Sequence, residues 1–182
     1  MFARTQRLTL RPGWPEDAAS LAQAIGHDAV ARMLTRVPLP YRTDDAAAFL
    51  ALPRGPHEPR FLIFAHDRGV RPALVGGIGI TPYDAGPELG YWLAPDAWGR
   101  GYATEAGRAV VAMARHSLPI TRLGAWHFID NPASGRVLRK LGFQPTGRAT
   151  TKRSAARPDA VESVEYSLDL AEEQRNPLPI AA

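Results

Sequence analysis

The stretch ELGYWLAPDAWGRGYATEAGRAVVAMA, from Glu88 to Ala114, joins a strand, a glycine turn and a helix without a break. Its first residues alternate as a strand does, and apolar residues recur at helical spacing from Ala103 to Met113. Between them, residues 99–101 read Gly-Arg-Gly. A helix start leaves unpaired N–H groups at the positive end of its dipole, and glycine lets an anion approach them closely. The order predicts an anion site; the alternative is a sharp turn that needs glycine only for its backbone conformation.

A second helix start follows in DNPASGRVLRKLGF, residues 130–143. Asn131 suits the N-cap, Pro132 suits the first helical position, and Gly142 is a typical stop beyond the helix. If the strands that precede the two helices are neighbours, both helices start at the same end of the sheet. Three basic residues on the second helix then favour a long ligand with several phosphates: Arg136, Arg139 and Lys140.

The rest of the chain predicts a mixed α/β domain with a central sheet of about seven strands. Apolar and alternating runs predict strands at residues 7–12, 60–67, 72–83, 87–95, 121–129, 143–151 and 161–170. Besides the two helices above, helical patterns cover residues 14–26, 29–34 and a segment that starts near Thr43. No internal repeat or linker divides the 182 residues, which indicates a single domain.

Composition excludes several classes of chemistry. The formal net charge of +4 suits a phosphate-bearing partner but does not by itself indicate nucleic acid. The chain has no cysteine, which excludes disulfides and an acyl-cysteine intermediate, and its five histidines lack metal-ligand spacing, so no metal is expected. MFARTQRLTL has no apolar signal core and no segment reaches membrane-spanning length, so we expect a cytoplasmic protein without membrane contact.

One segment of the chain is strongly basic. GRATTKRSAAR, residues 147–157, contains Arg148, Lys152, Arg153 and Arg157 without interleaved aromatic residues. We interpret it as a solvated hairpin tip rather than a nucleic-acid surface, because nucleic-acid-binding segments usually add aromatic side chains that stack on bases.

Three parts of the sequence together resemble the GNAT acetyltransferase superfamily, in the branch typified by the RimJ and RimL ribosomal-protein N-terminal acetyltransferases. They are RLTLRP, ELGYWLAPDAWGRGYATEA and DNPASGRVLRKLGF. The resemblance implies a twisted mixed sheet that is splayed between its fourth and fifth strands, with acetyl-CoA in the gap. Residues 1–171 would form this domain, and residues 172–182 a flexible tail.

The resemblance also implies which residues bind acetyl-CoA. The pyrophosphate loop corresponds to six residues in succession: Gly99, Arg100, Gly101, Tyr102, Ala103 and Thr104. The strand amides that hold the pantetheine arm and the acetyl carbonyl correspond to Trp92, Leu93 and Ala94. Asn131 resembles the side chain that binds the pantetheine arm, and Ser134 the hydroxyl that protonates the departing thiolate. Trp98 replaces the Gln or Arg that often opens this loop, but the loop works mainly through its backbone.

Glu88 is the candidate base for the acceptor amine. It shares a strand face with Gly90 and Trp92, so it can face the acceptor directly or through a water. It could instead only bind a cationic acceptor. Ser134 could likewise satisfy a first-turn amide, and Asn131 could be a plain N-cap. His127 is either an alternative base beside the cleft or a packed strand histidine.

The sequence therefore predicts an acetyl-CoA-dependent N-acetyltransferase whose acceptor amine is a protein N-terminus or a small molecule. Because no cysteine and no G-x-S-x-G elbow is present, we expect direct attack in a ternary complex rather than an acyl-enzyme. Two other classes stay open: a non-catalytic acyl-CoA sensor and a basic RNA- or ribosome-binding protein. The sequence does not fix the oligomeric state, and a homodimer stays open.

Overall fold

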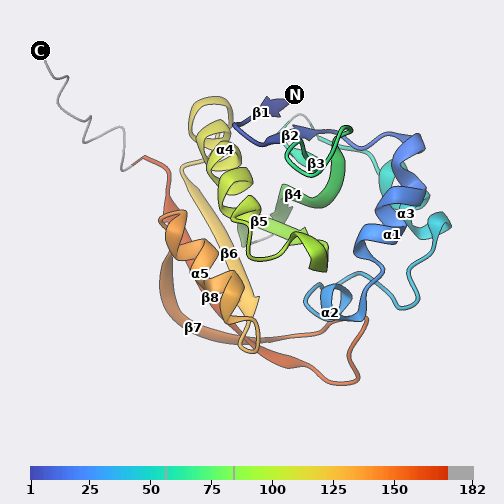
Figure 1. The fold of residues 1–182 in the computed structure, drawn as a ribbon. Coiled ribbons are helices and arrows are strands. Elements are labelled where there is room, and N and C mark those ends of the chain that lie inside the picture. The colour runs from blue at the N-terminus through green and yellow to red at the C-terminus, as the bar shows by residue number, and fades with distance from the viewer. Residues whose placement is uncertain (56, 84, 172–182) are drawn as a thin grey trace, which may run out of the picture.

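Eight strands form one mixed sheet, in the order β1-β2-β3-β4-β5-β6-β8-β7, in a computed structural model that describes residues 1–55, 57–83 and 85–171 (Figure 1). The strands are β1 Ala3–Arg4, β2 Leu8–Arg11, β3 Arg60–Ala65, β4 Ala73–Tyr83, β5 Gly86–Leu93, β6 Arg122–Phe128, β7 Gln144–Lys152 and β8 Val161–Asp169. The helices are α1 Ala18–Ile25, α2 Asp28–Ala31, α3 Thr43–Ala51, α4 Tyr102–Ser117 and α5 Pro132–Lys140, with 3-10 turns η1 Pro15–Asp17 and η2 Pro95–Ala97. The predicted tail at residues 172–182 lies outside the described residues.

The predicted mixed α/β fold and all seven predicted strands are confirmed. The eighth strand, β1, has only two residues and pairs antiparallel with β2. A run of two residues carries no alternation that a sequence pattern can detect. The helix predicted from Trp14 begins as the 3-10 turn η1, and the one predicted from Ala29 is the short α2.

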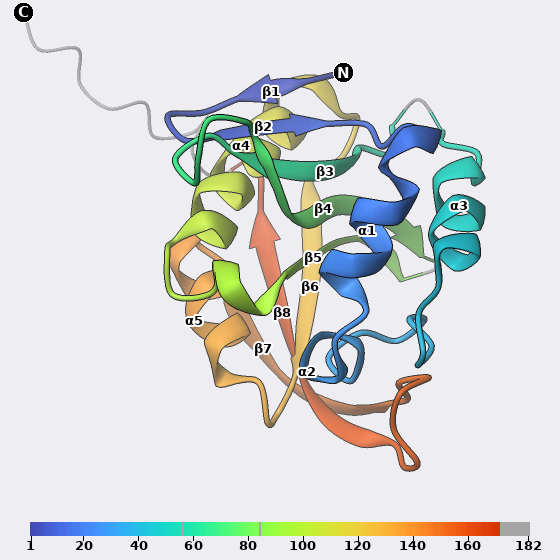
Figure 2. The same cartoon turned by 45° about the vertical axis from the view of Figure 1, so that its right-hand side comes forward.

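The helices form a layer on each face of the sheet. α4 and α5 cover one face, and α1 and α3 cover the other, as the two views of the ribbon show (Figures 1 and 2). Buried residues of α4, Ala106, Val110 and Ala114 among them, pack with β3 to β6 into the larger core. Leu21 and Ile25 of α1 pack with Leu62 of β3 into the smaller one. Alternate residues of the central strands therefore serve different cores.

The sheet opens between β5 and β6. β4 and β5 pair continuously from Gly76–Leu93 to Tyr83–Gly86, but β5 and β6 are parallel neighbours joined at one pair, Glu88 and Gly124. Beyond this pair the two strands diverge. The splay predicted between the fourth and fifth strands of the sequence pattern is thus confirmed. It places the starts of α4 and α5, which follow these two strands, at the same end of the gap.

The tip of the β7–β8 hairpin is bound to the segment around α2. Ser154 Oγ donates to the Ala31 carbonyl over 3.2 Å, and the Ala155 amide donates to the Thr35 carbonyl over 3.0 Å. The Arg157 side chain is only 6% exposed and pairs with Asp130 over 2.7 Å. We interpreted the hairpin tip as solvated. For Arg157 this is wrong, because its side chain is buried and paired with Asp130.

Gly135 brings α5 close to β6. A Cβ atom at Gly135 would lie 2.5 Å from Nε2 of His127, a buried side chain. We expect Gly135→Ala to lower the free energy of unfolding by about 1–3 kcal/mol, because an overpacked contact forces the helix and the ring apart. Urea unfolding would measure this loss. Gly90→Ala is the control, since a Cβ there meets nothing within 4 Å. Equal stabilities of the two variants would contradict the close packing of α5 on β6.

Candidate coenzyme loop and acceptor cleft

The Gly-Arg-Gly turn forms an open, uncapped helix start. Gly99 and Gly101 have φ angles of +75° and +80°, which other residues rarely adopt, and Gly101 is the N-cap of α4. No side chain among the described residues caps this helix, so the first-turn amides of Tyr102, Ala103 and Thr104 have no partner within it. A Cβ at Gly99 would meet nothing within 4 Å. The conformational need for glycine and the anion-accepting amides therefore occur together, and the loop fits a diphosphate.

Arg7, just before β2, holds this loop in place. Its Nη1 donates to the Arg100 carbonyl over 3.0 Å, and its Nη2 pairs with Glu105 Oε2 over 2.7 Å. Glu105, in the first turn of α4, also accepts from Thr5 Oγ1 over 2.6 Å and from the Arg7 amide over 2.9 Å. Burial alone would raise the pKa of Glu105, but these hydrogen bonds hold it below its ordinary value. Arg7 therefore neutralises the negative charge of Glu105 at the helix start where an anion would bind.

The first residue of α4 is anchored by its side chain. Tyr102 is fully buried, and its hydroxyl donates to Asp67 Oδ1 over 2.6 Å. Arg68 pairs with Asp96 of η2 over 2.7 Å, which ties the β3–β4 turn to the segment before the loop. Tyr102 can thus offer its backbone amide to a ligand, but its side chain belongs to the protein interior.

Not all of the backbone amides expected at the end of β5 are free to bind a ligand. The Ala94 amide donates to the Val75 carbonyl over 2.9 Å, so it is not free, contrary to expectation. Because successive N–H groups of a strand alternate between its two edges, the Leu93 amide faces the gap and that of Trp92 faces β4. Trp98 Nε1 donates to the Leu93 carbonyl over 2.9 Å, which fixes the loop to the strand. Of the three expected amides, only that of Leu93 faces the gap.

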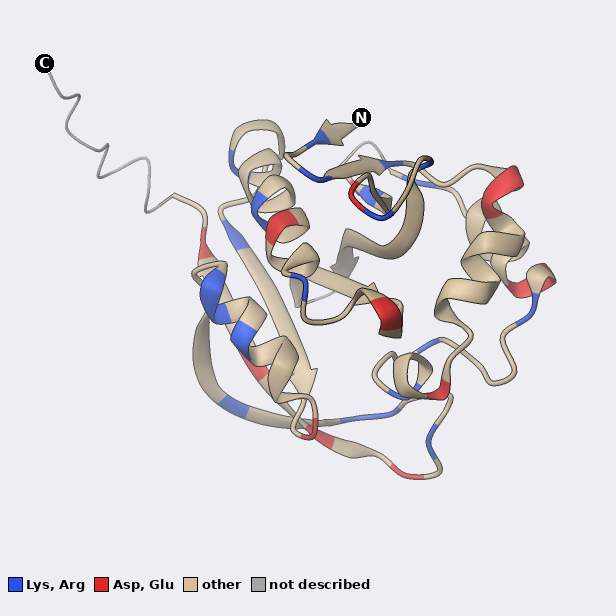
Figure 3. Ribbon diagram, viewed as in Figure 1, with Lys and Arg blue, Asp and Glu red and all other residues tan. Residues whose placement is uncertain are grey.

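The second helix start lies beside the first. Asn131 Oδ1 accepts from the Ser134 amide over 3.2 Å, and Pro132 occupies the first turn, so the predicted cap of α5 is confirmed. Figure 3 shows basic residues along the outer side of α5. Those on the helix are exposed: Arg136, Arg139 and Lys140.

Glu88 and Trp126 bridge the gap on the face opposite α4 and α5. Trp126 Nε1 on β6 donates to Glu88 Oε2 on β5 over 3.1 Å, and both side chains are half-buried. The ammonium of Lys152 lies 4.8 Å from the centre of the Trp126 ring. Gly90, next on this face of β5, is exposed and leaves open space beside Glu88. One carboxylate oxygen is thus held by the indole, and the side chain borders the open space at Gly90.

A family model for the acetyltransferase (GNAT) domain matches residues 7–144. The chain belongs to the GNAT acetyltransferase family. It is 31% identical over 149 residues to the uncharacterised N-acetyltransferase YoaA of Bacillus subtilis (strain 168), across 79% of this chain and 82% of YoaA. As a member of this family it is an N-acetyltransferase that uses acetyl-CoA.

Solved structures share the fold of this acetyltransferase. A GNAT-family acetyltransferase from Bacillus anthracis superposes with a TM-score of 0.78 at 22% identity, over 94% of this chain and 100% of that one. RimL, an acetyltransferase of the α-amino group of ribosomal L7/L12 in complex with coenzyme A, gives a TM-score of 0.76 at 18% identity, over 93% and 98%. At the level of the fold, the predicted likeness to the RimJ and RimL enzymes is confirmed.

A second polar pair of this acetyltransferase lies under α5. Tyr91 Oη on β5 lies 2.6 Å from Ser134 Oγ and 3.1 Å from the Ser134 carbonyl oxygen. The hydroxyl of Ser134 thus faces Tyr91 rather than satisfying a first-turn amide. Tyr91 was not predicted, because it lies on the apolar side of its strand. Burial raises the pKa of Tyr91 to about 12.

This raised pKa predicts a loss of stability at alkaline pH. An unfolded tyrosine ionises near pH 10, so between about pH 10 and 12 the unfolded chain has lost a proton that the folded chain keeps. Stability is full below pH 10, and the free energy of unfolding then falls by about 1.4 kcal/mol per pH unit. Tyr91→Phe should lack this component, measured by urea unfolding of both proteins at pH 9, 10 and 11. Parallel curves for the two would contradict the burial of the phenol.

His127 is packed between β6, β8 and α5. It is buried, its Nδ1 is 2.8 Å from the Phe128 carbonyl oxygen, and its Nε2 is 3.4 Å from Tyr166 Oη. Gly135 of α5 covers its ring. Of the two interpretations offered for this residue, the packed strand histidine is therefore correct, and its ring lies on the opposite sheet face from Glu88.

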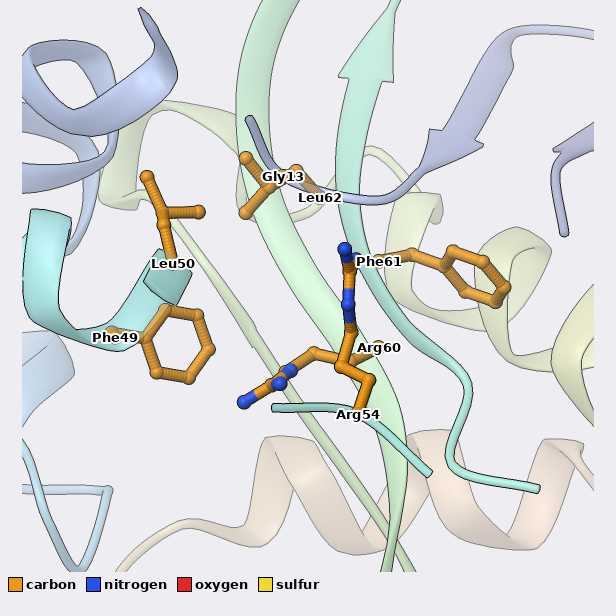
Figure 4. A pocket seen from close by; sticks show the side chains of 7 residues that line it. All are labelled: Gly13, Phe49, Leu50, Arg54, Arg60, Phe61 and Leu62. Carbon is orange, nitrogen blue, oxygen red and sulfur yellow. The ribbon is translucent and has the colours of Figure 1, made fainter. Parts of the chain in front are cut away.

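The hollow drawn in Figure 4 is a separate feature, between α3 and β3. Phe49, Leu50 and Leu62 form its apolar part, and Arg60 is held by the Leu52 and Pro53 carbonyls over 2.8 and 2.9 Å. It lies at the β3 side of the sheet, away from the gap beside β6. Within the described ranges there is no group of three or more acidic or histidine side chains arranged to hold a metal, and no helix that could cross a membrane.

Proposed function

We propose that this acetyltransferase binds the coenzyme diphosphate on the uncapped start of α4 and acetylates a primary amine held by Glu88. The observation that carries the proposal is the position of the open loop and of Glu88 at one gap in the sheet. The loop lies where β5 continues into α4, and Glu88 crosses the same gap to Trp126. The diphosphate site and the amine site are thus built from one strand, so bound reactants would be held in a fixed relation.

Besides Ser134, five groups of the chain would contact acetyl-CoA. The amides of Gly101, Tyr102 and Ala103 would bind the diphosphate at the positive end of α4. Asn131 would bind the pantetheine arm with its NH₂ group, because its oxygen already caps α5. The Leu93 amide would bind the acetyl carbonyl, where one such donor contributes about 10²–10³ in rate. Acetyl-CoA itself supplies the reactive thioester.

Glu88 would prepare the acceptor for attack. Trp126 holds one of its carboxylate oxygens and so fixes the orientation of the carboxylate. The other oxygen would accept a proton from the amine. Ser134 would hold the proton that the departing sulfur needs. Because no cysteine is present in the chain, the amine would attack the thioester directly.

A protein N-terminus is the acceptor that we favour. The RimL enzyme that shares this fold acts on the α-amino group of a ribosomal protein. The acceptor side offers Glu88 as the carboxylate nearest to the gap, with an aromatic wall at Trp126, which suits one ammonium group beside an extended backbone. A polycationic small molecule would need several carboxylates there.

The test is a thiol-release assay with acetyl-CoA against a panel of N-terminal peptides and small amines. The proposal expects coenzyme A release with at least one peptide, and acetylation at its α-amino group by mass spectrometry. Blocked peptides with an acetylated N-terminus are the control. Thermal stabilisation by acetyl-CoA without release for any amine would instead indicate the sensor class.

A further inference from the structure

The Tyr91–Ser134 pair is a half-buried polar contact that the fold alone does not require. Tyr91 comes from the core-facing side of β5, where Leu89 and Leu93 are its strand neighbours. An apolar side chain would fill that position without a hydroxyl to satisfy. Instead, its hydroxyl meets Ser134, the one residue of the first turn of α5 proposed to serve the thiolate.

The two hydroxyls have one hydrogen each, and either oxygen can donate in their contact. A phenol has one hydrogen, and it lies within reach of both the carbonyl and Oγ of Ser134, over 3.1 and 2.6 Å. In a helix the Ser134 carbonyl also accepts from the amide four residues later. Because Ser134 Oγ is the nearer of the two acceptors, we assign the phenol hydrogen to it. The hydrogen of Ser134 is then left to point elsewhere.

We propose that Tyr91 is a positioning residue that turns the hydroxyl hydrogen of Ser134 toward the sulfur of the coenzyme. The proposal rests on the proposed function, in which Ser134 provides a proton or hydrogen bond to the departing thiolate. Without Tyr91, a serine hydroxyl rotates freely and can turn its hydrogen to other acceptors. With Tyr91 as a donor behind it, one lone pair of Ser134 is occupied, so its hydrogen is restricted to the directions that point away from Tyr91.

The surroundings of Tyr91 keep its hydroxyl protonated. Burial raises its pKa to about 12, so the phenol stays protonated throughout the range in which an amine acceptor is reactive. Asn131 fixes the Ser134 amide from the other side, so the backbone that carries the hydroxyl is also held. The backbone of Ser134 and its hydroxyl oxygen are thereby both held, which is what a reacting group needs.

A double-mutant cycle tests the proposal: wild type, Tyr91→Phe, Ser134→Ala and the double variant. We expect Tyr91→Phe to lower kcat about tenfold, within the range for general acid catalysis, and to leave the KM for acetyl-CoA within about twofold. In the Ser134→Ala background the same change should have no further effect on kcat, since a residue that acts only through another is silent without it. Tyr166→Phe is the matched control, because Tyr166 is a second tyrosine of the same core, on the same sheet face.

The possible outcomes separate this inference from the proposed function. Equal fold-losses from Tyr91→Phe with and without Ser134 would mean a structural role and overturn the inference. Full activity of Tyr91→Phe, or a loss in Tyr166→Phe as large as its own, would do the same. In each case the wild type still releases coenzyme A, so the proposed function stands. Absence of release by the wild type with every amine defeats the proposed function and, with it, the inference.

Discussion

Glu88→Gln is expected to lower kcat for the acceptor amine by about 10²–10⁴-fold, while acetyl-CoA binds as in the wild type. Glutamine keeps the size of the side chain and its hydrogen bond from Trp126, over 3.1 Å in the wild type, but it cannot take a proton. Steady-state kinetics with the best peptide of the panel would give kcat and both KM values. Binding of acetyl-CoA would be measured separately by calorimetry.

The same experiment decides between the two roles considered for Glu88. A base lowers kcat when it is removed, whereas a group that only binds the acceptor raises its KM. Glu165→Gln is the matched control. Glu165 lies opposite Trp126 on β8 and accepts from Thr150 over 3.2 Å, so it shares the sheet face but not the bond across the gap. If the two variants lost activity equally, a general effect of negative charge would replace the specific role.

Arg7→Met is expected to raise the KM for acetyl-CoA at least tenfold and to destabilise the fold by about 2 kcal/mol, between the values for exposed and buried ion pairs. Methionine removes the bond to the Arg100 carbonyl and the pairing with Glu105. The Glu105 carboxylate, 18% exposed, would then lose its paired guanidinium at the start of α4 and keep its hydrogen bonds from Thr5 and the Arg7 amide. It would repel the diphosphate at the place where the first-turn amides attract it.

Arg11→Met separates the effect on the loop from the effect on stability. Arg11 pairs with Asp17 over 2.7 Å, with side chains 16% and 11% exposed, and its guanidinium lies over Trp14 and Phe64. Its loss should destabilise the protein at least as much as that of Arg7 and leave the KM for acetyl-CoA unchanged. Both quantities come from urea unfolding and steady-state kinetics. An equal rise of KM in both variants would show that the loop responds only to overall stability.

The helix starts of the candidate site could be predicted from the sequence, but the free strand amide could not. The helix starts at Gly101 and Asn131 were predictable because caps, glycine and proline act over a few residues. Leu93, Trp92 and Ala94 were indistinguishable in sequence, because pairing with β4 decides which amide is free, as the bond from Ala94 to Val75 shows. A single sequence carries no signal for a partner strand's register.

Contacts across long sequence distances were not predictable at all. The pairing of Arg7 with Glu105 joins residues 98 apart, and that of Tyr91 with Ser134 joins residues 43 apart. Arg157 gave the clearest error: a basic residue in a basic segment was interpreted as solvated, and it is buried against Asp130. Charge in a sequence does not reveal whether a distant carboxylate will meet it.

The sequence by itself determined the elements and the open start of α4, because hydrophobic periodicity and helix-end chemistry are local properties of the chain. Only the tertiary structure decided which groups meet at the gap: the Arg7 contact that compensates Glu105, the indole that orients Glu88, and the phenol behind Ser134. Each of these depends on strand order and register, which arise when distant segments pack together.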